Sequence, residues 1–325
     1  MVLGYDLLVV LAAASIATYF VATKIGSQWL SFISESKPFI STAGAFYSFA
    51  LVFRTNICYS RWWEGRCLWG ALIVCAIRIA QQARLWINDP SLIDRINYLT
   101  ITFAYCSKAQ LRGARIEDEA EYGNELVKKG IITKKEMDII ATQNGWQPFY
   151  CLDAMRAVVS EGIKAEDLEG GWKMNAAQAA MEDTIASLSN CIGGCLRVKS
   201  TGLPLAFDLI LNAVGALFFT AACLAWAPSA GFYNPIIVLV AYIMAKVITR
   251  VGTDMEDPFG YDASDLNLEL FCELIYKQII AVDERSELIT YDLARGPGSN
   301  DLDEETGAAA ALHSLPPATS ASVGQ

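Results

Sequence analysis

The chain has 325 residues, of which 54% are hydrophobic and only 18% are charged. Soluble domains average about 25% charged residues, so the composition favours a membrane protein. The single histidine, His313, lies close to the C-terminus. This excludes a Ser-His-Asp triad and an HExxH zinc site, and the sequence also lacks the phosphate-binding pattern GxxxxGK[ST]. We therefore expect a protein that is not an enzyme.

The net charge of −10 is concentrated in the C-terminal quarter of the chain. Residues 1–251 hold 22 Lys and Arg against 20 Asp and Glu, a net +2, whereas residues 252–325 hold 3 against 15, a net −12. The body of the chain is thus close to neutral, and we expect no nucleic-acid partner. From Gly296 onward the sequence is small, polar and rich in Gly and Pro. We expect one domain over residues 1–295 and a disordered tail over residues 296–325.

Four stretches are apolar over roughly the 20 residues that a membrane-spanning helix needs. In chain order they are residues 7–22, 38–58, 203–227 and 233–251. The first has Asp6 where a signal peptide would carry Lys or Arg, which favours a span over a cleaved leader. Basic residues gather after the second stretch, before the third and at the end of the fourth. By the positive-inside rule both termini and the middle region face the cytoplasm or stroma, and residues 23–37 face the opposite side.

The middle region, residues 65–200, is predicted to be helical. Asp89-Pro90 is typical of a helix start, with Asp as the cap and Pro in the first turn. Thr133 and Glu136 have the spacing of a capping box. An apolar stripe at helical spacing predicts a long helix that leads toward the third span; its members are Met174, Met181, Ile185, Leu188 and Ile192. The nine cysteines show no CxxC pair, and we expect them to be small buried thiols.

The second apolar stretch carries an unusual stripe. Ala45, Phe49 and Phe53 are spaced at i, i+4 and i+8 and therefore lie on one helix face. Small or weakly polar residues occupy other faces and permit close packing between helices. The aromatic stripe faces either a neighbouring helix, as ordinary packing, or a pore. The sequence pattern alone leaves both possibilities open.

Three motifs carry a resemblance to a known family. They are FRTNICYSRWWEGRCLWG at residues 53–70, CLRVKSTGLP at 195–204 and EDPFGYDASDL at 256–266. In this order they resemble the bestrophin family of anion channels, over about residues 5–290. The resemblance implies all-helical subunits, each with four transmembrane helices and long cytoplasmic helices, assembled as a homopentamer around one central pore.

The resemblance also implies where the pore is narrow. A hydrophobic neck would be formed by Ala45, Phe49 and Phe53, and a second constriction would lie near Ala179. The family has bulky residues at all three neck positions, so Ala45 predicts a neck that is wider at its outer end. A narrow apolar ring can exclude ions by dewetting, and the positive edges of aromatic rings favour anions.

The charged residues after the stripe are expected to support the end of the helix. Arg61 and Glu64 are spaced at i, i+3 and can pair with each other or with neighbours across the bundle. Trp62 and Trp63 suit the membrane interface. Arg54 is nearer the stripe and is predicted to raise the local anion concentration.

The acidic segment after the fourth apolar stretch has two readings. Animal bestrophins bind calcium in the corresponding clasp, and here only Asp262 and Asp265 remain of its run of acids. The spacing excludes an EF-hand, although backbone carbonyls can complete a calcium site. In the second reading, both residues cap a helix that begins near Leu266. The sparse acids favour the caps, and in the first reading calcium is a cofactor.

We therefore expect an anion-selective channel for chloride, bicarbonate or nitrate, with lipid and permeant anions as its partners besides its own copies. The alternatives are a coupled anion transporter, a membrane-embedded enzyme and a non-conducting scaffold. A carrier would place ionisable groups inside its spans, and apart from Asp208, Lys246 and the segment ends there are none. The expected location is a bacterial inner membrane or the thylakoid membrane of a plastid.

Overall fold

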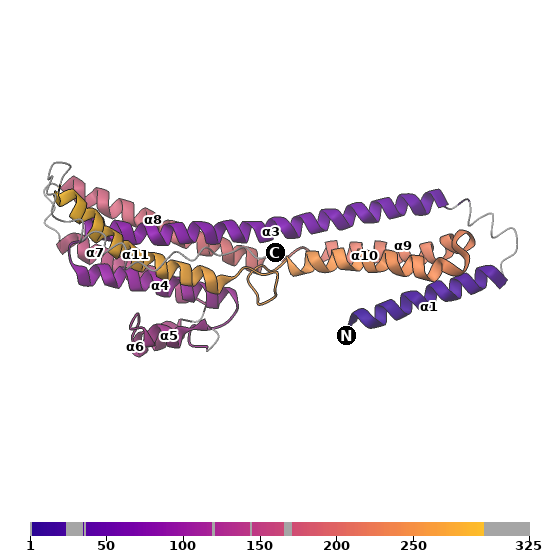
Figure 1. The fold of residues 1–325 in the computed structure, drawn as a ribbon, viewed down its shortest axis with the longest axis horizontal. Helices are drawn as coiled ribbons and strands as arrows, with labels where there is room; N and C mark the ends of the chain where they lie inside the picture. Colours follow the sequence, from indigo (N-terminus) through magenta and orange to yellow (C-terminus); the bar gives the residue numbers. More distant parts are fainter. Residues whose placement is uncertain are drawn as a thin grey trace, which may run out of the picture. The chain divides into compact units, whose positions relative to one another are not determined.

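The computed structural model of the chain describes residues 2–23, 35, 37–118, 121–143, 145–165 and 171–295. Every regular element within these ranges is a helix (Figure 1). The all-α prediction is therefore confirmed for this part of the chain. The described residues fall into two compact units, one up to Ile279 and one from Ile280 onward, and the description below concerns the first. The predicted tail and His313 lie outside the described residues.

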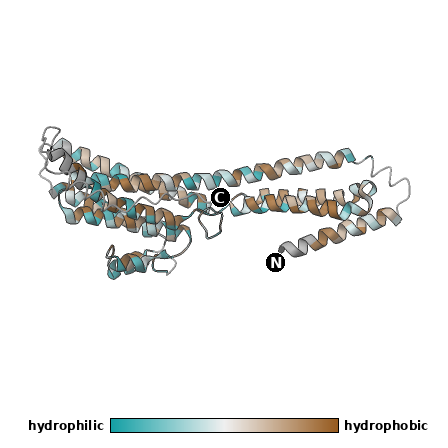
Figure 2. Cartoon of the chain, in the orientation of Figure 1, coloured by the Kyte–Doolittle hydropathy of each residue, from teal (hydrophilic) through white to brown (hydrophobic). Residues whose placement is uncertain are grey.

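Four apolar helical segments pack together in the first unit. They are α1 (Val2–Thr23), the N-terminal part of α3 (Lys37–Trp86), α9 (Leu205–Ala230) and α10 (Asn234–Asp254). Both α1 and α3 pack against α9 and α10. Hydrophobic residues dominate α1, α9 and α10, whereas α4, α7 and α8 carry many hydrophilic ones (Figure 2). Helices thus exist at all four predicted positions.

Only part of these helices meets the length and hydropathy expected of a membrane-spanning helix. Among the described residues, the region Met174–Asp254 contains the one helical window that is long and apolar enough to cross a membrane, and Leu8–Thr23 is a shorter apolar helix. Between α9 and α10 lies only the 3-10 turn Gly231–Tyr233. This matches the short connection expected between the third and fourth stretches.

The second apolar stretch does not end where the charged residues begin. Helix α3 runs without interruption for 50 residues, from Lys37 to Trp86. The chain therefore stays helical past the charged residues, and the helix itself does not end near Cys58. Residues in the second half of α3, such as Leu72, Ala76 and Ile79, are fully buried. Packing against neighbouring helices, rather than a turn, accounts for the mixture of charge and tryptophan that follows the apolar half.

The rest of the first unit consists of the middle helices and the start of α11. In chain order they are α4 (Pro90–Leu111), α5 (Gly123–Lys128), α6 (Lys134–Thr142), α7 (Gln147–Ala165), α8 (Gly171–Ser200) and α11 (Leu268–Arg295). Asp89 caps α4, since its carboxylate accepts from the Ser91 amide at 2.9 Å. Thr133 and Glu136 form the predicted capping box of α6. Both predicted helix starts are confirmed.

Helix α8 lies along the second half of α3 and against α7. Four residues of the predicted stripe are fully buried; they are Met181, Ile185, Leu188 and Ile192. A Cβ added at Gly194 would lie 2.8 Å from the Leu68 side chain, so a glycine permits the close approach of α8 to α3. Seven of the nine free cysteines are buried, while Cys75 is half-buried and Cys67 is exposed.

Candidate functional site

The stripe on α3 is exposed in the subunit. Phe49 is 69% and Phe53 is 46% exposed, and Ala45 is exposed on the same face. Their neighbours Tyr47 and Leu51 point into the core. The rings of Phe49 and Phe53 stack, with centroids 6.2 Å apart. We name Ala45, Phe49 and Phe53 the aromatic strip. It is part of the apolar surface that the first half of α3 leaves exposed, which also includes Phe46 and Val52.

The strip is attached at one end to the start of α9. Phe53 also stacks on Phe207, with ring centroids 6.2 Å apart. The residues that follow Phe53 and Phe207 in the sequence are also joined, because Arg54 Nε donates to Asp208 Oδ1 at 2.7 Å. A stacked pair and an ion pair thus fix adjacent residues of the two helices. Sequence reasoning missed Phe207, since only contact with Phe53 distinguishes it from other residues of the third apolar stretch.

Arg54 is held by acidic groups on two segments. Its side chain is 5% exposed and lies against Asp208 and, at 3.6 Å, Glu256 Oε2. Glu256 in turn accepts from the Leu203 amide at 3.1 Å. A Cβ at Gly252 would lie 2.9 Å from Arg54 Nη1, so this glycine makes room for the guanidinium. With its charge compensated by two carboxylates, Arg54 fits a supporting role better than that of an exposed anion attractor.

Arg61 and Glu64 do not pair with each other. Arg61 donates to the carbonyls of Val198 at 2.7 Å, Glu256 at 3.3 Å and Thr201. Some of these carbonyls lie at the C-terminus of α8, where the last carbonyl groups have no N–H donor within the helix. Glu64 instead accepts from Arg197 at 2.6 Å. The i, i+3 pairing is therefore wrong, and the alternative of partners on neighbouring segments is correct.

The motif around Trp62 lies directly against the acidic segment. Trp62 Nε1 donates to the Ser264 carbonyl at 3.1 Å. Phe259 is fully buried, and a Cβ at Gly65 would come within 3.0 Å of its ring. The two long motifs, about 190 residues apart in sequence, therefore form one contact. This explains the tryptophan and glycine of the first motif and the Pro-Phe-Gly of the second.

Asp262 and Asp265 do not cap a helix. Helix α11 begins at Leu268, and Asn267 Oδ1 accepts from the Leu270 amide at 3.0 Å, which makes Asn267 its cap. Asp265 Oδ2 accepts from the Asp262 amide at 2.8 Å and closes a tight turn. A Cβ at Gly260 would lie 2.7 Å from this oxygen. The acids thus shape a turn that precedes the helix.

The fit to a calcium ion is incomplete. Asp265 Oδ1 is buried and has no hydrogen-bond partner in the described structure. Burial, followed by the nearby carboxylates of Asp262, Asp257 and Asp254, raises the pKa of Asp265. Calcium takes six to eight oxygen ligands, but no group of three or more His, Cys, Asp or Glu side chains suited to a metal occurs among the described residues. The described side chains therefore do not make up a calcium site.

Ala179 is exposed on α8, next to the fully buried Ala177. The neighbouring carbonyl of Ala180 accepts from Gln82 of α3 at 3.2 Å, which places Ala179 level with the end of that helix. From Phe53 to Gln82 are 29 residues, or about 44 Å along a helix. The aromatic strip and Ala179 are thus two separate exposed features beside one continuous helix.

A buried charge cluster was not foreseen from the sequence. Lys108 Nζ lies 3.1 Å from Glu121 Oε2, and both side chains are fully buried. Tyr261 donates to Glu121 at 2.8 Å. Arg112 contacts Glu121 at 3.8 Å and forms a two-pronged pair with Glu269. The hydrogen bond from Arg112 holds the pKa of Glu269 below its usual value. The cluster joins α4 to α11 and to the acidic segment.

Comparison with known proteins is consistent with this geometry. A voltage-dependent anion channel-forming protein of Nostoc sp. is 27% identical over 240 residues, 70% of this chain and 72% of that protein. One from Ralstonia nicotianae is 27% identical over 266 residues, 78% of this chain and 80% of that protein. A solved bestrophin homolog from Klebsiella pneumoniae has the same fold, with a TM-score of 0.72 and 21% identity over 87% of this chain and 98% of that one.

The family model gives the assignment. Residues 3–281 match the model of the bacterial and fungal bestrophin proteins, and this range contains the aromatic strip, the contact between the two long motifs and the buried charge cluster. The described fold agrees with that of the solved bestrophin homolog. The chain belongs to the bacterial and fungal bestrophin family.

Proposed function

We propose that the chain is one subunit of an anion-selective channel whose neck is the aromatic strip. The observation that carries the proposal is the exposure of Phe49 and Phe53, whose rings stack on each other on a helix that the Arg54–Asp208 pair joins to α9. Relatives that cover most of the chain are named as anion channel-forming proteins, which supports the same activity here.

The strip has the chemistry that a narrow anion path requires. Stacked rings 6.2 Å apart present an apolar surface without a charged group. Such a constriction can dewet and close, and ring edges turned toward the axis carry partial positive charge. An anion that sheds water readily gains from this, whereas a cation does not. Chloride, nitrate and bicarbonate are the permeant anions we propose.

The assembly that would form such a path is a homopentamer. Each subunit contributes one copy of α3, so that five strips surround the axis and Ala179 of α8 forms a second constriction further along. The helices α1, α9, α10 and the first half of α3 cross the membrane, which is a bacterial inner membrane or a thylakoid membrane. Exposed apolar rings of this size mark a surface that is covered by lipid or by other subunits.

A coupled anion transporter is the second candidate, and the pairing of Asp208 counts against it. Carriers use ionisable groups within their spans as ion or proton sites. Asp208 is joined to Arg54 at 2.7 Å, which leaves it engaged in the packing of α3 and α9. We propose passive conduction instead.

Recording from purified protein in planar bilayers tests the proposal. With different chloride and potassium gradients, the reversal potential should follow the anion gradient. Currents should show unitary steps, and size-exclusion chromatography with light scattering should give five chains per particle. A reversal potential that follows potassium as closely as chloride would contradict the proposed selectivity. Transport that requires a second ion would favour the carrier.

A further inference from the structure

Two pairs of cysteines contact each other in the described part of the chain, and they differ in their access to solvent. Cys106 on α4 and Cys151 on α7 have sulfur atoms 3.9 Å apart, and both side chains are fully buried. In the second pair, the thiol of Cys191 on α8 donates a hydrogen bond to the sulfur of Cys75 on α3. Cys75 is half-buried, and Cys191 is 7% exposed. The second pair therefore combines two adjacent thiols with access from solvent.

The packing of α3 against α8 holds this second pair together. A Cβ added at Gly194 would lie 2.8 Å from the Leu68 side chain, and Arg78 Nε donates to the Thr184 hydroxyl at 2.9 Å. One cysteine of the pair lies between Leu68 and Arg78 in the sequence, and the other lies between Thr184 and Gly194. Both thiols therefore lie in the stretch of the two helices that these contacts enclose.

The surroundings of Cys75 favour its thiolate form. The hydrogen bond from the Cys191 thiol lowers the pKa of Cys75 to about 7; burial opposes this shift, the charge of Arg78 adds to it, and Asp183 opposes it. The same hydrogen bond raises the pKa of Cys191, so Cys191 keeps its proton. Near neutral pH, a large fraction of Cys75 is therefore thiolate, which is the reactive form of cysteine.

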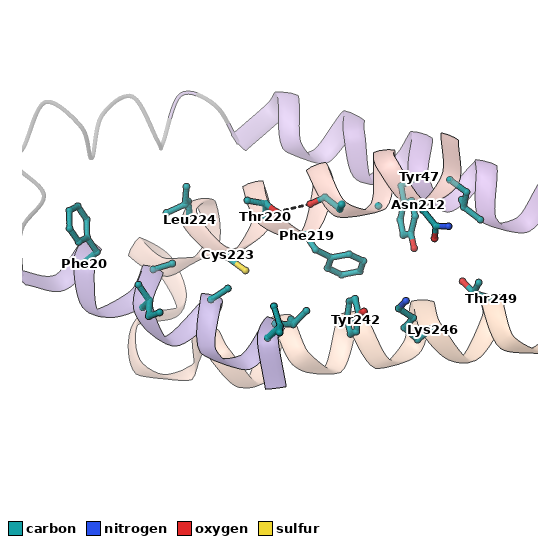
Figure 3. Close-up of a pocket in the computed structure, with 18 residues that line it drawn as sticks. Phe20, Tyr47, Asn212, Phe219, Thr220, Cys223, Leu224, Tyr242, Lys246 and Thr249 are labelled. Carbon is teal, nitrogen blue, oxygen red and sulfur yellow. Dashed lines mark hydrogen bonds between the residues drawn. The ribbon is translucent and has the colours of Figure 1, made fainter. Parts of the chain in front are cut away.

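Other cysteines of the chain lack either access or a partner. Cys67, two turns before Cys75 on the same helix, is exposed, but the structure describes no second thiol in contact with it. Cys195 is fully buried. Cys223 lines a cavity of about 670 Å³ among α1, α3, α9 and α10 (Figure 3), where apolar surroundings disfavour a thiolate. Cys75 and Cys191 thus unite a reactive, accessible thiol with a second thiol beside it.

We propose that Cys75 and Cys191 are an oxidation-sensitive pair, which a hydroperoxide converts to a disulfide between α3 and α8. The Cys75 thiolate attacks one oxygen of the peroxide and the O–O bond breaks, which leaves a sulfenic acid on Cys75. The hydroxide that departs takes up the proton that Cys75 had released. The Cys191 sulfur then attacks the Cys75 sulfur, the S–O bond breaks, and water leaves with the Cys191 proton. With hydrogen peroxide, two thiols and one peroxide give one disulfide and two water molecules, and two electrons pass from sulfur to oxygen.

The location of the pair suits a reversible bridge. Both cysteines lie in the region expected to face the cytoplasm or stroma, where disulfides are usually transient and redox-sensing. Thiol reductants open such a bridge by exchange. The bridge joins α3, which carries the aromatic strip, to α8, which carries Ala179, and it restricts the movement of one helix along the other. Its formation is independent of whether the chain conducts anions.

Hydrogen peroxide treatment of the purified full-length protein in maltoside detergent at pH 7, followed by mass spectrometry, tests the pair. We expect free thiols to fall from nine to seven, because the bridge consumes two. Proteolysis without reduction should release one linked peptide that contains Cys75 and Cys191, and dithiothreitol should restore both thiols. Retention of all nine thiols, or a bridge between any other two cysteines, would overturn the proposal. Oxidation of Cys75 to a sulfinic acid with Cys191 still free would also contradict it.

Matched variants separate the pair from the other thiols on the same two helices. Cys75→Ala and Cys191→Ala should each abolish the bridge. Cys67→Ala and Cys195→Ala are the controls, because each removes a thiol near one member of the pair on the same helix, and both should leave the bridge intact. Equal loss of the bridge in Cys67→Ala and Cys75→Ala would refute the assignment.

The pH dependence of alkylation tests the hydrogen bond between the two thiols. In the Cys67→Ala background, the rate at which iodoacetamide modifies Cys75 should reach half of its maximum near pH 7, because the thiolate is the form that reacts. Cys191→Ala removes the donor, and we expect the half-maximum to move toward about pH 8.5, the ordinary value for cysteine. Cys195→Ala should leave it near pH 7. Identical profiles with and without the Cys191 thiol would show that Cys191 does not activate Cys75 and would overturn the pairing.

Discussion

Arg54 and Asp208 form a 2.7 Å ion pair that ties the buried face of α3 to the start of α9, and the residue before each belongs to the Phe53–Phe207 stack. The pair therefore holds one end of the aromatic strip. Any movement of Phe53 relative to α9 would strain or break the ion pair between Arg54 and Asp208. The pair gives the strip a fixed support within the subunit.

Removal of the carboxylate should loosen this support. Asp208→Asn removes one of the two negative charges that balance the buried guanidinium of Arg54. We expect the free energy of unfolding to fall by about 1.5–3 kcal/mol, the typical contribution of a hydrogen bond to a charged group. Denaturant unfolding in detergent measures this loss. The control is Asp183→Asn, whose 3.1 Å pair with Arg78 is largely exposed and should contribute at most about 1 kcal/mol. Equal effects of the two variants would argue against a special role for Asp208.

The rings of the strip should control conduction. Phe49→Ala and Phe53→Ala each remove a ring from the proposed constriction, and we expect a higher open probability or a weaker preference for anions, with the oligomer intact on size exclusion. Phe232→Ala removes a more exposed ring, 87% accessible, in the turn between α9 and α10, and should leave currents unchanged. Wild-type currents in the Phe49→Ala, Phe53→Ala double variant would assign the rings to ordinary packing.

The small residue at the outer position of the strip should set its width there. Ala45 is exposed, so Ala45→Phe can be accommodated without disturbing the core. Five added rings would narrow the outer end of the neck, and we expect a several-fold lower unitary conductance while the Tm changes little. A conductance equal to that of the wild type would place Ala45 away from the conduction path.

The buried charge cluster should make stability depend on acid pH. The hydrogen bond from Arg112 lowers the pKa of Glu269 in the folded protein. A carboxyl group with a lowered pKa contributes stability above its ordinary pKa, and this contribution is lost as the pH falls through the lowered value. We expect Tm to fall below about pH 4.5, the ordinary range of glutamate, and Glu269→Gln to flatten this dependence. Thermal unfolding from pH 7 to pH 3 measures it, and an identical pH profile for both proteins would exclude Glu269 as its source.

Local patterns were the predictable part of this structure. Apolar runs gave the helices, and the caps at Asp89 and Thr133 gave two of their starts, because each depends on residues only a few positions apart. The continuity of α3 was missed because packing against α8, distant in sequence, allows charged residues to remain helical. Arg61 bonds to a carbonyl more than 100 residues away in the sequence. In the buried charge cluster, the Lys108–Glu121 pair is local to α4 and the loop that follows it, but Tyr261 reaches Glu121 from more than 100 residues away. No spacing rule reports such contacts.

The acidic turn should work without calcium. Asp265 closes the turn by accepting from the Asp262 amide, and burial together with neighbouring carboxylates raises the pKa of Asp265. A raised carboxyl pKa means that ionisation destabilises the folded state, so this residue costs stability as the pH rises through its ordinary range. Asp265→Asn keeps an oxygen for the same hydrogen bond and removes the charge. We therefore expect Asp265→Asn to have an equal or higher Tm than the wild type at pH 7 in the presence of EGTA. We expect the currents of both proteins to be independent of calcium.

A bound calcium ion would instead lower the pKa of Asp265 and make Asp265→Asn less stable than the wild type, since the cation would favour the ionised carboxylate. Micromolar calcium that raises the Tm and the open probability of the wild type, with both effects absent from Asp265→Asn, would show that the turn is a calcium site.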